Sequence, residues 1–484
     1  METLQHTRLL GFDDGGEVFE LPDVIYRRIG EQHKQGVAGL HRLYEVHGFA
    51  AKGIVETTLR ADGDLEHKKL VTSYPYEWPA NMYKDAVLFH LGLFGELDRA
   101  GLTLKDGLPN NIVFDRTAPV FVDFLSLVPL DALKDEQWLE AGGYADARFA
   151  VLAKMLLPFL VLPLLFMGRH QFGLARDLLS SRSCNTGGKP PSWRELLPPP
   201  RGRRLGALKR YLHSLFDGAA LLNIRRAAKS RGGSDFGRTI DAITGLVRSL
   251  DVTPPISAYS SYYDEKKDAH ALGDPASFLP KQKAVHGILG EKRPRSVLDL
   301  GANTGWYSVL AASLGASVIA LEEDESCVDI LYARAKKQNL SILPLKASFS
   351  DLTKEIHGAD RLTEAYADRG VGTNPLYRSG VERLGADLVL VLGLVHHLVL
   401  GEGRSIEDVF GVLAKLAAKT LVLEFIAFDD DRIRESPDFF PSLRKFHPSN
   451  YSIEKTMEVG CRHFSSVEVL ASHPATRTIL VFDK

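Results

Sequence analysis

The spacing of apolar residues changes along the chain and marks out its parts. Residues 1–130 combine short β-like runs with one clear amphipathic helix, predicted over Ala80–Arg99, where apolar side chains recur on one broad stripe. Helical, apolar sequence then extends from about Trp138 to Leu179. These patterns predict an α+β N-terminal region over residues 1–180.

The segment 151–168 is apolar enough to need a check for a membrane span. It contains Lys154, Pro158 and Pro163, and its length is at the short limit for crossing a bilayer. Its flanks lack an anchoring pattern. We therefore favour a buried, kinked helix pair and expect no membrane span.

Residues 181–255 are predicted to form a helical, basic connector. The stretch 181–204 is rich in Pro, Gly, Ser and Arg, as interdomain loops are. Between Arg201 and Arg231, nine Lys or Arg residues stand against a single acid, Asp217. A patch for an anionic partner is one interpretation. The aromatic residues of this stretch, Tyr211 and Phe216, do not alternate with the charges as a stacking surface for nucleic acid requires, so a solvated basic helix is favoured.

From about Pro254 onward, short β-rich runs alternate with helical runs. This alternation predicts a mostly parallel sheet with helices on both faces, closed by an antiparallel pair of strands, over residues 256–484. The candidate strands are Ser296–Leu300, Ser317–Leu321, Ser341–Lys346, Asp387–Leu392, Thr420–Phe425, Ser465–Leu470 and Arg477–Phe482.

The strongest motif lies where the first of these strands ends, in the sequence DLGANTG. Gly301 and Gly305 let the backbone turn sharply and approach a ligand, and the helix that follows presents unpaired N–H groups. The loop reads GxNxG, whereas a dinucleotide site reads GxGxxG. Asp299 would repel a pyrophosphate but suits an ammonium group, and Glu322, at the end of the second strand, can accept two ribose hydroxyls.

These motifs, together with the sequence ADLVLVLGLVHHL from Ala386 to Leu398, resemble those of class I S-adenosylmethionine-dependent methyltransferases. The resemblance implies a seven-stranded Rossmann-like domain that binds S-adenosyl-L-methionine. It also implies roles for individual residues. Asp299, Gly301, Asn303 and Gly305 would line the methionine and ribose part of the cofactor, Glu322 would hold the ribose, and Ser348, within the loop Ala347–Phe349, would reach the adenine.

Two histidines follow the fourth predicted strand, at the edge of a parallel sheet where ligands bind. A neutral imidazole of His396 or His397 could take a proton from the methyl acceptor, and these two are the candidate catalytic residues. The alternative is that either histidine is simply packed and hydrogen-bonded. Glu424 is a further candidate on the acceptor side, and Tyr262 or Tyr263 could cover the cofactor.

The N-terminal region carries a second motif, LKDGLPNNIVFD followed by VDF. It resembles the catalytic segment of protein kinases and aminoglycoside phosphotransferases, with Asp106 as the base and Asn111 and Asp123 as metal ligands. The His-Arg before the base is missing, no GxGxxG loop precedes it, and Lys52 is a poor substitute for the usual strand lysine. We therefore expect a kinase-like scaffold without catalysis.

Composition adds exclusions rather than a function. The net charge of −2 favours neither nucleic acid nor membrane, and Cys184, Cys327 and Cys461 are too scattered for a disulfide framework or a zinc site. The N-terminus shows no signal peptide pattern, so a cytoplasmic protein without a metal is expected.

The sequence SYPYEW from Ser73 to Trp78, the segment LKDGLPNNIVFD and the methyltransferase motifs together resemble those of a bacterial family of long methyltransferases that includes nodulation-type proteins, and this resemblance spans most of the chain. This leaves three hypotheses: a methyltransferase acting on an oxygen or nitrogen of a small molecule or glycan, a bifunctional kinase and methyltransferase, or a non-catalytic cofactor-binding partner. The sequence indicates neither the acceptor nor the oligomeric state.

Overall fold

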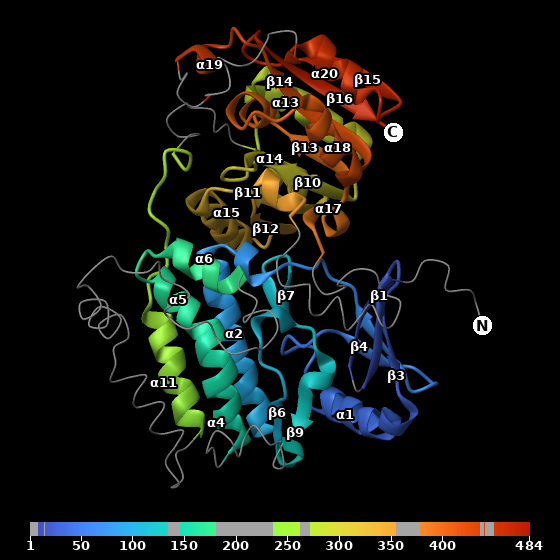
Figure 1. Ribbon diagram of the computed structural model, residues 1–484, viewed down its shortest axis with the longest axis vertical. Coiled ribbons are helices and arrows are strands. Elements are labelled where there is room, and N and C mark those ends of the chain that lie inside the picture. Colours follow the sequence, from blue (N-terminus) through green and yellow to red (C-terminus); the bar gives the residue numbers. More distant parts are fainter. Residues whose placement is uncertain are drawn as a thin grey trace. The chain divides into compact units, whose positions relative to one another are not determined.

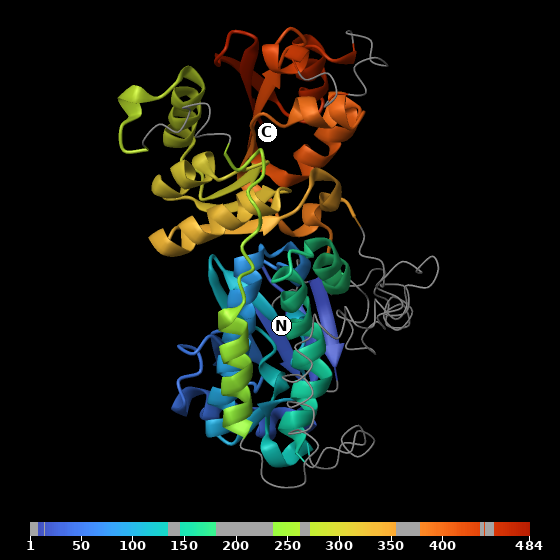
Figure 2. The ribbon, with the colours of Figure 1, turned by 90° about the vertical axis from the view of Figure 1, so that its left-hand side faces the viewer.

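The computed structural model describes residues 8–13, 15–133, 146–180, 236–261, 272–354, 378–435, 440 and 450–484. The chain divides into two compact units, residues 1–253 with 356–377 and residues 254–355 with 378–484. Figure 1 labels their helices and strands, and Figure 2 shows the same ribbon from a second side. The basic stretch Arg201–Arg231 and the aromatic pair Tyr262–Tyr263 lie outside the described residues.

The N-terminal unit begins with a five-stranded antiparallel sheet of order β1-β2-β3-β5-β4. Helix α1 (Lys34–Val46) follows β3 and buries Val37, His41 and Tyr44. The ring of Tyr44 meets that of Phe124 at 5.3 Å, which ties α1 to a segment 80 positions later. The strands are β1 (Arg8–Asp13), β2 (Gly16–Glu20), β3 (Val24–Ile29), β4 (Thr57–Leu59) and β5 (Leu65–Lys68).

Helix α2 has the predicted bounds, Ala80–Arg99, and its apolar stripe is buried. Two small antiparallel sheets follow it, β6 with β9 and β7 with β8. Their strands are β6 (Leu102–Leu104), β7 (Ile112–Asp115), β8 (Ala118–Phe121) and β9 (Leu127–Pro129). Short helical turns join them, η3 (Pro109–Asn111) and η4 (Phe124–Ser126).

The apolar segment forms one helical run built of α4 (Ala147–Val151), the π-helical η6 (Leu152–Val161) and α5 (Leu162–Met167). Pro163 has no N–H to offer the carbonyl of Phe159 one turn earlier. The hydroxyl of Tyr83, on α2, lies 3.0 Å from the carbonyl oxygens of both Phe159 and Leu160 and donates to them instead. Helix α2 therefore satisfies the backbone that the proline leaves unbonded.

By length and composition, Arg148–Met167 is the one helix within the described residues that could cross a membrane, and 75% of its most apolar window is buried inside the protein. Buried core helices are equally long and apolar, so this is weak evidence for a span.

Helices α6 (Phe172–Ser180) and α11 (Phe236–Ser249) follow in the same unit. Helix α11 lies alongside α2, where Phe236 meets Phe94 edge to face (Figures 1 and 2).

The C-terminal unit contains a seven-stranded sheet of order β12-β11-β10-β13-β14-β16-β15. The first five strands in this order pair in parallel, and β16 runs antiparallel to both of its neighbours. The strands are β10 (Ser296–Leu300), β11 (Ser317–Glu322), β12 (Ile342–Lys346), β13 (Ala386–Val391), β14 (Ala417–Ile426), β15 (Ser466–Ala471) and β16 (Arg477–Asp483).

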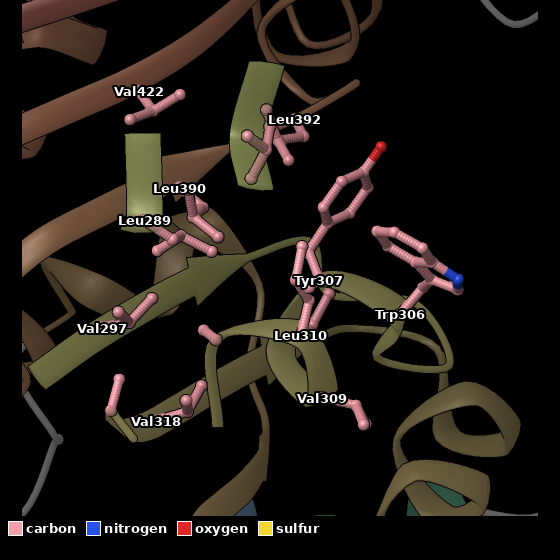
Figure 3. Close-up of a cluster of buried hydrophobic side chains, with 14 of the residues drawn as sticks. Leu289, Val297, Trp306, Tyr307, Val309, Leu310, Val318, Leu390, Leu392 and Val422 are labelled. Atoms are coloured by element: carbon pink, nitrogen blue, oxygen red, sulfur yellow. The ribbon is translucent and has the colours of Figure 1, made fainter. Parts of the chain in front are cut away.

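Helices cover both faces of this sheet. On one face, α13 (Pro280–Lys292), α14 (Trp306–Ser313) and α15 (Glu325–Gln338) bury a cluster that includes Leu390 and Val422 (Figure 3). The other face meets α18 (Ile406–Leu416), which contacts β13 and β14. Shorter helices are α17 (Gly380–Arg383), α19 (Asp431–Glu435) and α20 (Ile453–Gly460). Strand order reverses between β10 and β13, and ligands bind at the carboxyl ends of strands at such a point.

Candidate functional site

The turn after β10 has the strained backbone that its glycines predict. Residues Gly301, Asn303 and Gly305 have φ angles of +72°, +52° and +81°. A Cβ on Gly305 would lie 2.3 Å from Cδ1 of Leu331, so only glycine fits there. At Gly301 the nearest atom would be 3.6 Å away, and this residue is exposed. Gly305 therefore serves packing, whereas Gly301 leaves an open backbone surface.

Every backbone N–H of this turn is already bonded within the protein. Those of Gly301 and Ala302 donate to the carbonyl of Leu321, and that of Gly305 donates to Ala302. The N–H of Asn303 donates to Glu322 at 2.7 Å, and that of Thr304 donates to the side chain of Asn303 at 2.6 Å. The turn therefore offers no row of free donors to a pyrophosphate, in line with the departure from GxGxxG.

Asp299 lies at the start of this turn and is almost fully buried, with 2% of its surface exposed. The hydroxyl of Ser308, on α14, donates to its carboxylate at 2.6 Å. Burial raises the pKa of Asp299 to about 6, with Glu322 adding to the rise while Ser308 and Lys281 oppose it. A cation at this position would therefore relieve an unfavourably buried charge.

Glu322, the last residue of β11, fixes the turn. Its two carboxylate oxygens accept from the N–H groups of Asn303 and Asp324, at 2.7 and 2.8 Å. Burial raises its pKa, although these hydrogen bonds oppose the rise. Each oxygen keeps a further lone pair, so the carboxylate can still accept a pair of ligand hydroxyls.

Ser348, predicted to reach the adenine, has a structural task at the end of β12. It caps the short helix η8 (Phe349–Leu352), and its hydroxyl donates to Asp351 at 2.7 Å while accepting from the N–H of the same residue. The side chain is therefore held within its own turn.

Tyr263 lies outside the described residues, but Tyr259 of the same aromatic segment is described. The carbonyl of Tyr259 accepts from Nδ2 of Asn303 at 3.0 Å. Burial, together with the charges of Glu322 and Asp324, raises the pKa of its hydroxyl. The prediction that Tyr262 or Tyr263 covers the cofactor concerns residues outside the described part of the chain, and Tyr259 is the nearby aromatic residue that the structure places beside the turn.

His396 and His397 lie just beyond β13 with their ring centroids 4.1 Å apart and their planes tilted by 43°, and Phe440 lies beside both. Burial, together with the charges of His397 and Arg477, lowers the pKa of His396 well below its usual value, and burial also lowers that of His397. Both rings are therefore neutral near pH 7. Nδ1 of His396 is buried and has no hydrogen-bond partner within the described part of the chain.

A buried ion pair, not predicted from the sequence as a pair, lies at the end of β14. The carboxylate of Glu424 accepts from the ammonium of Lys281 at 2.6 Å and from the hydroxyl of Ser472 at 3.1 Å. Glu424 was a candidate on the acceptor side, but Lys281 was missed because α13 precedes the first motif by almost 20 residues. Nothing in local spacing connects the two.

The kinase-like residues of the N-terminal unit also come together. The side chain of Asn111 donates to the carbonyl of Asp106 at 3.3 Å, and the carbonyl of Asn111 accepts from the N–H of Val122 at 2.8 Å, next to Asp123. Asp106 is held by Ser126, whose hydroxyl accepts from its N–H at 2.7 Å. Burial raises the pKa of Asp106.

Arg27, on β3, faces Asp123 with its Nη1 atom 3.5 Å from the carboxylate. Lys52 does not take this place, because it is partly exposed and pairs with Glu96. Strand β3 reads VIYR from Val24 to Arg27, where kinases have VAIK. This similarity could have identified Arg27 as the cation of the site, but Arg27 was not predicted. The preceding hairpin has Gly11 and Gly16 at the outer positions of a GxGxxG loop, with an acid at the central one.

Comparisons with known proteins give one relative with substantial coverage. No family model matches the chain. It is 24% identical over 380 residues to the nodulation protein NoeA of Rhizobium meliloti (strain 1021), and the match covers 76% of this chain and 72% of that protein. The resemblance to nodulation-type proteins is thereby confirmed.

The similar solved structures include methyltransferases. One is the bifunctional kinase-methyltransferase WbdD, at 17% identity and a TM-score of 0.29, with 49% of this chain covering 45% of that one. Another is an O-methyltransferase family protein from Burkholderia thailandensis, at 15% identity and a TM-score of 0.28, with coverages of 42% and 54%. This chain thus spans less than half of the WbdD chain, and these TM-scores are too low for likeness alone to assign a function.

Proposed function

We propose that the C-terminal unit transfers a methyl group from S-adenosyl-L-methionine to an oxygen or nitrogen of a small-molecule or glycan-type acceptor. The observation that supports this most directly is the turn after β10. Its own N–H groups are all satisfied, and the polar groups it leaves for a ligand are the acids Asp299 and Glu322 beside the exposed backbone of Gly301. Acids at these two places suit an ammonium group and a ribose, and they repel phosphate.

The proposed roles follow from these contacts. Asp299 would face the ammonium of the cofactor, Glu322 its ribose hydroxyls, and the turn from Gly301 to Gly305 would carry it. His396 and His397 would border the acceptor. When bound, the cofactor supplies an activated methyl group on a sulfonium, so orientation of the acceptor provides much of the acceleration.

The substitution Asp299→Asn tests the cofactor site. We expect the affinity for S-adenosylmethionine to fall by about 10- to 100-fold, since the ammonium loses its ionic partner. Because the pKa of Asp299 is raised to about 6, the wild type should bind fully above pH 6 and lose affinity as pH falls through 6, when the carboxylate takes up a proton. The variant should lack this dependence. Calorimetry between pH 5 and 8 measures both.

Asp387 offers a matched control. It is the second residue of β13, at the end of the strand away from the histidines, and pairs with Lys419 at 3.0 Å. Asp387→Asn should leave cofactor affinity and its pH dependence unchanged. Equal affinity in wild type and Asp299→Asn would remove the site assignment. Binding without turnover on any acceptor would favour the non-catalytic alternative.

A second candidate function is phosphoryl transfer or nucleotide binding by the N-terminal unit. It is favoured by the assembly of Arg27, Asp106, Asn111 and Asp123 from separate segments. The departure from the GxGxxG pattern at position 13, where a kinase loop has its central glycine, opposes it. The proposal therefore remains secondary to methyl transfer.

Nucleotide binding to the whole chain separates the two outcomes. If the unit binds ATP with Mg²⁺, Asp123→Asn should reduce affinity at least about tenfold, because the metal loses a ligand. Asp13→Gly restores the central glycine of the GxGxxG pattern and should strengthen binding. Calorimetry with ATP, with and without Mg²⁺, checks both. Absence of any nucleotide binding in wild type and Asp13→Gly would eliminate this candidate.

A further inference from the structure

The ion pair of Lys281 and Glu424 lies on the same rung of the sheet as the glycine turn. The strand registers align Leu300 with Val391 and Val391 with Leu423. Glu424 is the residue after Leu423, and Gly301 is the residue after Leu300, so Glu424 and Gly301 lie level with each other across the sheet. Residues that are level on neighbouring strands share a face of the sheet. That face is the one covered by α13 and α14.

Glu424 is completely enclosed, with 0% of its surface exposed, and its carboxylate accepts from the ammonium of Lys281 at 2.6 Å. The backbone of Gly393, just past β13, approaches its carboxylate, since a Cβ there would lie 3.8 Å from Oε2. The ammonium of Lys281 also lies 5.4 Å from the ring centroid of Tyr307. Figure 3 shows this ring extending toward Leu392 from the start of α14. The pair thus borders the ends of β10, β13 and β14.

His396 and the carboxylate of Glu424 both lie here, and taking up a proton would change their charges in opposite ways. An imidazole becomes charged when it accepts a proton, whereas a carboxylate becomes neutral, and a low-dielectric interior favours neutral forms. Around His396, burial and the charges of His397, Arg477 and Lys281 all lower the pKa, with only Asp430 opposing them. His396 is therefore a poor proton acceptor. Its Nδ1 atom, without a partner among the described residues, remains able to hydrogen-bond an incoming group.

We infer that Glu424, rather than the histidine pair, takes the proton during methyl transfer, and that the acceptor is an uncharged hydroxyl oriented by Lys281 and His396. This inference rests on the proposed methyl transfer. When bound, the cofactor supplies a methyl group whose bond to sulfur breaks, with both electrons kept by sulfur, as the acceptor oxygen bonds to carbon. The hydroxyl proton passes to Glu424. One positive and one negative charge disappear together, so the net charge of the buried site does not change.

Lys281 selects the class of acceptor. Its ammonium can donate to an oxygen on which negative charge develops, and this lowers the cost of removing the hydroxyl proton. An acceptor that is already anionic, such as a carboxylate, would be repelled by Glu424, and an amine would gain nothing from a second ammonium beside it. The site therefore favours an alcohol or a phenol.

Infrared spectroscopy of the whole chain, without cofactor, tests whether Glu424 can take up a proton. In Lys281→Met the buried carboxylate loses its cation and should become protonated at neutral pH, giving the carbonyl stretch of a carboxylic acid. Other buried carboxyls, such as Asp299, absorb equally in all variants, so the band is read from difference spectra against the wild type. It should be absent from the double variant Lys281→Met/Glu424→Gln, in which position 424 can form no carboxylic acid. If Lys281→Met folds and shows no such band, the assignment of Glu424 is wrong.

Activity gives the second test, with a methyl hexoside and catechol as hydroxyl probes and benzoate and benzylamine as contrasts. We expect release of S-adenosylhomocysteine with a hydroxyl probe, a drop in kcat of at least about 100-fold in Glu424→Gln, and a drop below about tenfold in His396→Asn. Cofactor affinity should be unchanged in both variants, and Glu424→Asp, which keeps the carboxylate, should retain part of the rate.

The outcomes separate this inference from the function on which it rests. Greater loss in His396→Asn than in Glu424→Gln overturns the assignment of Glu424, and methylation of benzoate or benzylamine without that of any hydroxyl probe overturns the acceptor class. Absence of cofactor binding in the wild type overturns the proposed function itself.

Discussion

Replacing Gly305 by alanine should abolish detectable cofactor binding and destabilise the C-terminal unit by about 3 kcal/mol or more. The φ angle of +81° is strained for any residue with a Cβ. The added methyl group would also lie 2.3 and 2.8 Å from the two branches of Leu331, which is fully buried on α15. Calorimetry with S-adenosylhomocysteine and thermal unfolding measure the two effects.

Gly315 provides the control for this substitution. It has a φ angle of +97°, in the same strained region, but a Cβ there would meet nothing within 4 Å. Gly315→Ala should therefore cost only the backbone strain, about 1–2 kcal/mol, and leave cofactor affinity intact. If the two variants behave alike, the contact with Leu331 is not what makes Gly305 necessary.

Acid should destabilise the N-terminal unit more than its surface charges suggest. Burial lowers the pKa of His90 and of His67 from 6.5 to about 3. The unfolded chain takes up these protons below about pH 6.5, but the folded unit does so only near pH 3, so stability is lost as pH falls between these values. At pH 5 each histidine should account for about 2 kcal/mol of the loss.

His90→Phe isolates one of the two contributions. Neither ring nitrogen of His90 has a hydrogen-bond partner within the described residues, and its ring packs edge-on against Phe121. Phenylalanine keeps that packing without a titratable group, so the variant should lose about 2 kcal/mol less than the wild type between pH 7 and pH 5. Hydrogen exchange of α2 in the full chain, corrected for intrinsic rates, reports the difference. Parallel losses in both proteins would show that His90 takes up its proton in the folded unit at the same pH as in the unfolded chain, so that its pKa is not lowered.

Local patterns sufficed for much of the C-terminal unit. Each candidate strand has a counterpart within a few residues, because a buried parallel strand is a short apolar run bounded by turn residues. The DLGANTG turn and the acid at Glu322 were found for the same reason. The residues of the turn follow one another in the chain, and Glu322 ends the neighbouring strand. In a sheet of alternating strands and helices, the ends of consecutive strands lie side by side.

The sequence by itself determined the strands of the C-terminal sheet, helix α2 and the acidic turn, since each depends on periodicity or on backbone geometry over a few residues. Only the tertiary structure decided which distant side chains meet. It pairs Arg27 with Asp123 and Lys281 with Glu424, and it holds the side chain of Ser348 in the N-terminal cap of η8. It also made His396 a neutral, buried ring. Burial and long-range pairing set the charge of a group, and neither is encoded in spacing along the chain.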